Sequence, residues 1–273
     1  MPPASPFEPR GTSSGTLRLR CQTVGCTYDS PNGAVRALEN VSFTAQGQEI
    51  VSIVGPSGCG KSTLLRIIAG LQSTTVGQVS FDRNGTREEP RCGLVFQEAG
   101  VFPWMTVLDN LAFGLEMQGV SHAERVERAM DFAVRLGLNG FVYHYPRELS
   151  VGMRQRVDIG RAFVADAPVL LMDEPFGALD AQTRRVLQQE LLTIWHASRK
   201  LVLLVTHDID EAVLLADRVI VLSGRPGTVR DEITVTLPRP RDLARDRARI
   251  QEVTWHIWNL LEADVRRELS LPR

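Results

Sequence analysis

The chain has 273 residues, of which 43% are hydrophobic and 23% are charged, enough for one large core or two modest lobes. Its formal net charge is −1, which argues against nucleic acid as a partner, because nucleic-acid binders usually carry a strongly basic stripe. No run approaches the roughly 18 apolar residues that a membrane span requires, so any pore would have to come from another chain.

Residues 1–16 are rich in Pro, Ser, Gly and Thr and have little apolar periodicity, which predicts a disordered extension. From residue 17 to residue 230, strand patterns alternate with helix patterns, which predicts an α/β fold with a substantial parallel sheet. Residues 231–273 are expected to form a helical tail. Its apolar stripe consists of Ile250, Val253, Ile257, Leu260 and Leu261.

The four cysteines have a spacing that matches no zinc pattern, and the N-terminus has no signal-peptide pattern. We therefore expect a reducing, cytosolic environment and unremarkable thiols. One of them, Cys59, lies inside a glycine-rich loop.

That loop follows an apolar strand pattern at residues 49–54 and has the form G-x-x-x-x-G-K-[ST]. Glycines allow backbone N–H groups to turn toward phosphate oxygens, and the helix that follows presents its positive N-terminus. Lys61 is expected to reach the β- and γ-phosphates, and the Ser62 hydroxyl to bind Mg²⁺. The residues expected to line this phosphate site are Gly55, Pro56, Ser57, Gly58, Cys59, Gly60, Lys61, Ser62 and Thr63.

A helical lobe is predicted between the sheet elements, over about residues 98–165. Ser121 and Glu124 have the spacing of a capping box, and Gly137 is a plausible helix end. The helix between them is expected to bury one apolar face. Its members are Val126, Met130, Ala133 and Val134.

Polar residues follow three further apolar strand patterns, at the points where these strands end: Gln97, Asp173–Glu174 and His207. Each is usually only a polar strand end or a structural side chain. Because strand tips of an open α/β sheet meet at the ligand site, the phosphate loop favours a functional interpretation. Asp173 and Gln97 are then metal ligands with Ser62, while Glu174 polarises a water and His207 contacts the γ-phosphate.

The segment LSVGMRQR at residues 149–156 resembles the signature of the ATP-binding-cassette family, and the resemblance covers residues 17–230. Val151 stands where the family usually has its first glycine and Met153 where it has glutamine, but Ser150 and Gly152 remain, so hydrolysis is expected to survive. The further nucleotide contacts that the resemblance implies are Tyr28 (stacking on adenine), Ser150, Val151, Gly152, Met153 and Asp180.

The resemblance implies a P-loop NTPase (RecA-like) parallel-sheet core with an antiparallel β portion and an inserted helical subdomain. It also implies a head-to-tail pair of copies that binds ATP and Mg²⁺, each ATP lying between the phosphate loop of one copy and Ser150–Gly152 of the other. Glu174 would be the base toward water, and His207 and Lys61 would stabilise developing charge.

The segments FPWMTVLDN at 102–110 and GRPG at 224–227 are similar to importer subunits of the nitrate, sulfonate and taurine group. The implied partners are two transmembrane permease subunits, contacted by residues after Gln97 and around Arg147–Glu148, and indirectly a periplasmic or extracellular solute-binding protein. The chain would then lie peripherally on the cytoplasmic face of the inner (plasma) membrane. Alternatively, Phe102 and Trp104 only pack the helical lobe.

Other functions stay open at this point. A cassette ATPase of DNA repair or translation usually has coiled-coil insertions or two tandem cassettes, and an exporter usually has fused membrane helices. A small P-loop kinase would not explain residues 149–156. An importer subunit for another small solute, such as a pyrimidine precursor of thiamine, is a further alternative.

Overall fold

The computed structural model describes residues 15–29, 31, 33–198, 200–239, 241 and 245–268. Residues 1–14 of the expected N-terminal extension lie outside the described residues, as do the last five of the C-terminal tail. Within the described ranges, no helix is long and apolar enough to cross a membrane.

Two β-sheets form the framework. The larger has the strand order β10-β9-β3-β8-β7-β6, in which all neighbours are parallel except β10 and β9. Its strands are β3 (Ile50–Val54), β6 (Cys92–Val95), β7 (Val169–Asp173), β8 (Leu201–Val205), β9 (Arg218–Leu222) and β10 (Val229–Thr234). Every residue of β3, β7 and β8 is buried, which explains their uninterrupted apolar sequences.

The smaller sheet is antiparallel, with the order β2-β1-β4-β5. Its strands are β1 (Leu17–Tyr28), β2 (Val35–Gln46), β4 (Val76–Arg83) and β5 (Thr86–Glu88). In β3, Val51 and Ile53 pack toward this sheet, whereas Ile50 and Val54 pack toward the helices on the opposite face. The period of two along a strand thus divides the interior into two apolar cores.

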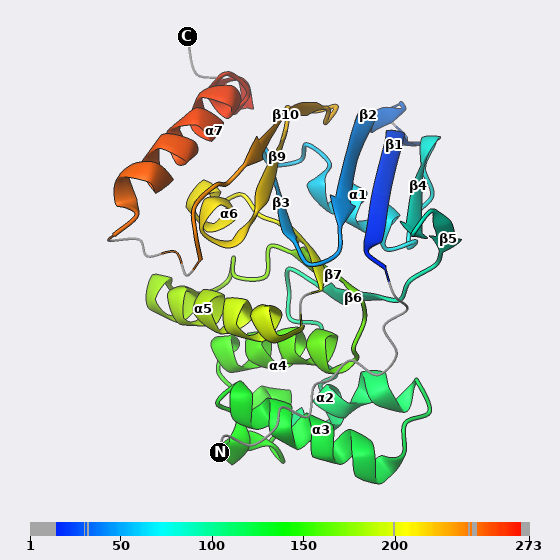
Figure 1. Ribbon diagram of the computed structural model, residues 1–273, viewed down its shortest axis with the longest axis vertical. Helices are drawn as coiled ribbons and strands as arrows, with labels where there is room; N and C mark the ends of the chain where they lie inside the picture. The colour runs from blue at the N-terminus through cyan, green and yellow to red at the C-terminus, as the bar shows by residue number, and fades with distance from the viewer. Residues whose placement is uncertain are drawn as a thin grey trace.

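Figure 1 shows α2, α3 and α4 together at one end of the molecule and α7 at the other. The α-helices are α1 (Lys61–Ile68), α2 (Val107–Glu116), α3 (His122–Arg135), α4 (Val151–Val164), α5 (Ala181–Ser198), α6 (Ile209–Leu215) and α7 (Arg247–Glu268), and the 3₁₀ turns are η1 (Asn139–Phe141) and η2 (Pro146–Glu148). The fold prediction is therefore confirmed: a parallel core, an antiparallel portion and helices inserted between β6 and β7.

The predicted face of α3 was partly wrong. Ala133 is fully buried, but Val134 is 60% exposed and Phe132 is buried in its place. At 100° per residue, Val134 points well away from the direction shared by Ala129 and Ala133, whereas Phe132 borders it. The side chain of Ser121 does accept a hydrogen bond from the backbone N–H of Glu124.

The C-terminal part does not begin as a helix at residue 231. The strand β10 continues to Thr234, because it pairs with β9 as the edge of the larger sheet. The expected stripe lies on α7, where Ile250, Ile257 and Leu261 are buried.

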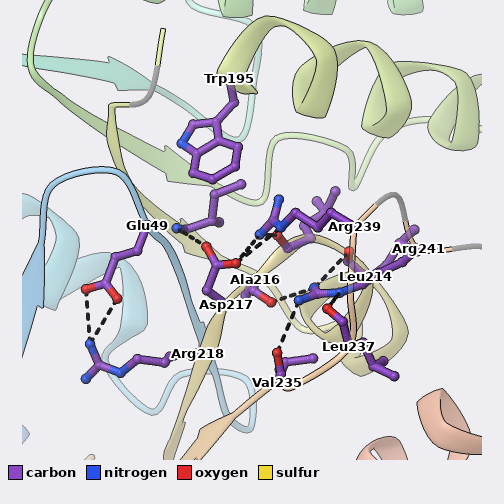
Figure 2. Close-up of polar contacts among 12 residues, drawn as sticks. Glu49, Trp195, Leu214, Ala216, Asp217, Arg218, Val235, Leu237, Arg239 and Arg241 are labelled. Atoms are coloured by element: carbon purple, nitrogen blue, oxygen red, sulfur yellow. Dashed lines mark hydrogen bonds and ion pairs between the residues drawn. The ribbon is translucent and has the colours of Figure 1, made fainter. Parts of the chain in front are cut away.

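Two arginines fasten the segment between β10 and α7 to the core (Figure 2). The buried Arg241 side chain donates to five backbone carbonyls: those of Val213, Leu214 and Ala216 at the end of α6, and those of Val235 and Leu237. Arg239 donates to Asp217 at 2.8 Å and lies over the Trp195 ring at 4.6 Å. The carbonyls that a helix end leaves unpaired are satisfied in this way by a side chain from the segment.

Candidate functional site

The glycine-rich loop joins β3 to α1. The buried Lys61 ammonium donates to the carbonyls of Gly55 and Pro56, both at 2.9 Å, and is thereby held across the loop. Gly60 has a φ of +105°, and a Cβ there would lie 2.7 Å from Leu38 and 2.9 Å from the Ala37 carbonyl. Only glycine suits both the conformation and the space, so this turn at the N-terminus of α1 depends on it.

Ser62 and Asp173 meet although they lie on different elements. The Ser62 hydroxyl donates to Oδ1 of Asp173 at 2.9 Å. Burial raises the pKa of Asp173 above its ordinary value, the hydrogen bond from Ser62 opposes this shift, and the charge of Glu174 adds to it. A positive charge nearby would therefore stabilise the ionised form of the Asp173 carboxylate.

Glu174 follows directly and receives two partners from other strand tips. Its Oε2 lies 3.0 Å from Nδ1 of His207 and accepts from Nε2 of Gln97 at 3.2 Å. The backbone N–H of Glu174 donates to the Val205 carbonyl, and its φ of +46° is unusual for a residue with a side chain. The strand tips of β6, β7 and β8 therefore converge on this one carboxylate.

A cleft of about 380 Å³ lies over the loop and these groups. The sequence-predicted residues that line it are Tyr28, Ser57, Gly58, Gly60, Lys61, Ser62, Thr63, Gln97 and Glu174. Tyr28 is 37% exposed at its edge, and the tyrosine hydroxyl lies 3.0 Å from the Thr63 hydroxyl. The cleft has an aromatic ring near the start of α1 and an acid with two polar partners.

Two predicted residues near this cleft, Cys59 and His207, are placed differently. Cys59 is fully buried beneath the loop, and a Cβ on Gly55 would lie 2.9 Å from its sulfur. His207 contacts Glu174 but is not part of the cleft wall, and its side chain is 60% exposed. Among the described residues, no cluster of three His, Cys, Asp or Glu side chains forms a metal site.

The signature-like segment lies away from the cleft, at the N-terminus of α4. The Ser150 hydroxyl caps this helix by accepting from the Met153 N–H, and Val151 is 47% exposed. A Cβ on Gly152 would lie 2.9 Å from the Thr183 side chain of α5. In the described chain, none of Ser150–Met153 lines the cleft, so one copy alone does not bring the two sets together.

Asp180 is also outside the cleft wall. Its carboxylate accepts from the backbone N–H groups of Gln182 and Thr183, each at 3.0 Å, and so caps the first turn of α5. Hydrogen bonding from Thr183 lowers the pKa of this exposed carboxyl below its ordinary value. In one copy, Asp180 is therefore a helix cap with one face toward solvent.

The segment after Gln97 is tied to α4. The buried Asp158 of α4 pairs with Arg161 at 3.0 Å, and a Cβ on Gly100 would lie 3.2 Å from the Arg161 guanidinium and 3.5 Å from the Asp158 carboxylate. The Arg161 guanidinium lies over the Phe102 ring at 4.8 Å, and Phe102 also stacks on Trp104 at 5.4 Å. Phe102 thus packs the helical region as the alternative interpretation expected, while Trp104 is 69% exposed.

Sequence reasoning missed three residues of the cleft wall: Val35 and Ala37 of β2, and Arg225. The two apolar residues carried no distinguishing signal. Arg225 did, because it stands in the glycine- and proline-containing segment GRPG after β9, and β9 neighbours the strand that leads into the phosphate loop. The strand-tip rule, applied to β9 as well, would have found it.

Comparison with known proteins places these features in a family. Residues 38–177 match the family model described as ABC transporter. The chain is 47% identical over 232 residues to the nitrate import ATP-binding protein NrtD of Synechocystis (85% of this chain, 87% of that protein). It is 49% identical over 213 residues to the taurine import ATP-binding protein TauB of Burkholderia thailandensis (78% and 82%).

A solved structure is also similar: a dimeric, post-hydrolysis ATP-binding cassette bound to ADP and phosphate. It has 32% sequence identity to this chain and a TM-score of 0.70, and the match covers 81% of this chain and all of that one. In that protein, a cassette of this fold pairs with a second copy while it holds the products of hydrolysis.

Proposed function

Because this chain belongs to the ABC transporter family of ATPases, we propose that it is the ATP-hydrolysing subunit of an importer and drives a separate membrane permease. The observation that carries this proposal is the split arrangement of its motifs. The cleft holds Lys61, Ser62 and Glu174, whereas Ser150–Met153 lie outside it on α4. A second copy, turned head to tail, would bring its Ser150–Met153 to the open side, and the dimeric relative supports such pairing.

In the proposed mechanism, the loop N–H groups and the Lys61 ammonium bind the β- and γ-phosphates of ATP, and the Tyr28 ring stacks on adenine. Glu174 orients the attacking water and takes its proton. Its contacts with His207 and Gln97 hold the carboxylate in place, and His207 can turn from Glu174 toward the γ-phosphate. Lys61 and His207 stabilise the negative charge that develops on the transferred group.

A magnesium ion fits the donor set beside the loop. The Ser62 hydroxyl and the Asp173 carboxylate are the hard oxygen donors that Mg²⁺ prefers, and they already lie 2.9 Å apart. Mg²⁺ usually takes only one or two protein ligands beside substrate phosphates, and the Gln97 amide oxygen could complete this set. When bound, the ion neutralises charge on the phosphate oxygens.

We further propose that closure of the pair reaches a permease through the segment after Gln97. Asp158 and Arg161 of α4, the helix that Ser150 caps, lie against Gly100, and the Arg161 guanidinium lies over the Phe102 ring at 4.8 Å. A movement of α4 against the sheet would therefore move this segment, next to which Trp104 is exposed. The partners would be two permease subunits and indirectly a solute-binding protein, with the chain on the cytoplasmic face of the membrane.

The proposed cargo is a small anion or zwitterion of the nitrate, sulfonate or taurine group, supported by the names of the relatives at 47% and 49% identity. The second candidate is a cassette ATPase not coupled to transport, or an importer subunit for a different small solute. A growth experiment separates these candidates, because only a coupled importer links the ATPase site to the use of one nutrient.

The test uses a strain whose only copy carries Glu174→Gln, with the wild-type gene restored as control. It is grown on nitrate as sole nitrogen source and on taurine or an alkanesulfonate as sole sulfur source. A defect on one source, with normal growth on ammonium and sulfate, is the expected result. Normal growth on all sources would reject the cargo group, and no ATPase activity in the purified wild-type protein would reject the site.

A further inference from the structure

A short loop after β9, residues 223–228, is held in a fixed shape by its own first side chain. The Ser223 hydroxyl lies 3.0 Å and 3.2 Å from the carbonyls of Gly224 and Pro226, to which it donates, and 2.9 Å from the Thr228 hydroxyl. The backbone N–H of Thr228 donates back to Ser223 at 3.0 Å. These contacts fix the shape of the loop. Its position in the fold is then set by its contacts with other segments.

One side of the loop lies against the phosphate loop. The Gly227 N–H donates to the Ala37 carbonyl at 2.9 Å, and the Gly227 carbonyl accepts from Glu39 at 3.0 Å. A Cβ on Gly227 would be only 2.2 Å from the carbonyl oxygen of Cys59. The backbones of the two loops are therefore in direct contact.

Arg225 projects from this loop into the wall of the nucleotide cleft, which it shares with Lys61, Thr63 and Tyr28. Among the residues that the structure describes, none forms a hydrogen bond or ion pair with Arg225. An unpaired guanidinium has five N–H donors and a permanent charge, and phosphate oxygens are its best-matched partners. Arg225 adds a second cation to a cleft that Lys61 also lines.

The other side of the loop is held by α7. Oδ2 of the buried Asp264 accepts from the Gly224 N–H at 2.8 Å and pairs with Arg230 at 2.8 Å. The helix itself is tied to α6 by the hydrogen bond from Thr254 to Asp210 at 3.0 Å. Ile257 and Leu261 of α7 are buried in the core, so Asp264 lies on a helix that is packed against the rest of the fold.

We propose that Arg225 is a further nucleotide-binding residue that contacts the phosphate chain of ATP or ADP, and that Asp264 of α7 is its positioning residue. This inference rests on the proposed nucleotide cleft. Because Asp264 contacts the backbone next to Arg225 and not the cleft itself, it acts only by placing Arg225. Through this loop, the C-terminal helix α7 influences the affinity of the cleft for nucleotide.

ADP binding to the purified protein, measured by titration calorimetry, tests the proposal without hydrolysis. Arg225→Ala should weaken ADP binding by about fivefold to twentyfold, as expected for loss of a charge-assisted contact at a partly open site. Asp264→Ala should weaken it by about threefold or more. The double variant should bind as weakly as Arg225→Ala alone, because the two residues act through one contact.

Two matched controls accompany this cycle. Asp264→Asn keeps a carbonyl oxygen for the Gly224 N–H and should bind ADP within about twofold of wild type. Arg267→Ala removes an exposed partner of Asp264 at 3.3 Å and should also leave affinity within about twofold. Thermal unfolding of each variant separates loss of fold from loss of binding. The test of Arg225→Ala stands whether or not Asp264→Ala folds.

The outcomes distinguish the possible failures. Normal ADP affinity in Lys61→Ala would reject the cleft as the nucleotide site. If Lys61→Ala loses ADP affinity while Arg225→Ala keeps it, the cleft stands and only the role of Arg225 is overturned. An Asp264→Ala effect that persists in the Arg225→Ala background would overturn the positioning role. If added salt weakens wild-type and Arg225→Ala binding equally, Arg225 contacts the base or ribose and the phosphate assignment is overturned.

Discussion

The Ser62 hydroxyl donates to the Asp173 carboxylate at 2.9 Å, although 111 residues separate them in the chain. One lies in the first turn of α1 and the other at the last position of β7. The parallel strands β3 and β7 flank β8 and end at the same edge of the sheet, so the residues at their ends meet there.

Lys61→Ala is expected to abolish productive nucleotide binding and to lower ATPase activity by about 10²-fold or more. The ammonium bridges the loop through the carbonyls of Gly55 and Pro56, so its loss removes both a phosphate contact and a loop clamp. The measurement is ATP binding together with phosphate release. Arg87→Ala, on an exposed position of β5, serves as control, and normal activity of Lys61→Ala would refute the site.

Glu174→Gln is expected to hold ATP without hydrolysing it and to accumulate a dimer on size-exclusion chromatography. The amide keeps the size of the side chain but cannot take the proton from water. Glu127→Gln, on the exposed face of α3, should remain active and monomeric with ATP. If Glu174→Gln stays monomeric in the presence of ATP, the proposal that each copy binds the ATP of the other through its signature segment is contradicted.

His207→Ala should lower the rate of ATP hydrolysis by about tenfold to 10²-fold while ATP affinity changes little, because the histidine contacts Glu174 and not the cleft wall. Measuring both the turnover number and the Kd for ATP separates a role in the hydrolysis step from a role in binding. A Kd for ATP that rises by the same factor as the rate falls would instead show that His207 contacts ATP in the ground state.

Glu211→Gln should change the pH dependence of stability. Burial raises the pKa of Glu211 to about 8, and the charge of Asp208 contributes. The folded state therefore keeps a proton that the unfolded chain releases above its ordinary pKa, so stability falls as pH rises from about 4.5 to about 8, by up to ~1.4 kcal/mol per unit.

In Glu211→Gln this slope should disappear, and the variant should gain stability over wild type as pH rises toward 8. Urea unfolding at pH 5, 6, 7 and 8 provides the measurement, with Glu127→Gln as the exposed control. Parallel pH profiles for wild type and Glu211→Gln would show that Glu211 is ionised in the folded protein across this range.

The order of motifs along the chain was enough to predict the family and the parallel core. Each of the buried strands β3, β7 and β8 is a continuous apolar run followed at once by its polar tip, so strand and site residue are adjacent in sequence. The same local signal placed Gln97, Glu174 and His207, and the structure brings these three together.

Local patterns failed where two elements had to meet. The buried face of α3 includes Phe132 and not Val134, a choice set by the direction from which α2 and α4 pack. Similarly, β10 reads as a polar stretch, and only its pairing with β9 makes it a strand. Neither partner is encoded in the segment itself.

By itself, the sequence determined the phosphate loop, the paired acids and the parallel character of the core sheet, because each follows from a short local pattern: an apolar strand run ends in its polar tip, and strand patterns alternate with helix patterns. Only the tertiary structure decided that Arg225 reaches the cleft, that Asp264 holds its loop, and that Ser150–Met153 lie elsewhere. Those placements depend on packing between segments far apart in sequence, where the geometry of the whole fold sets the distance.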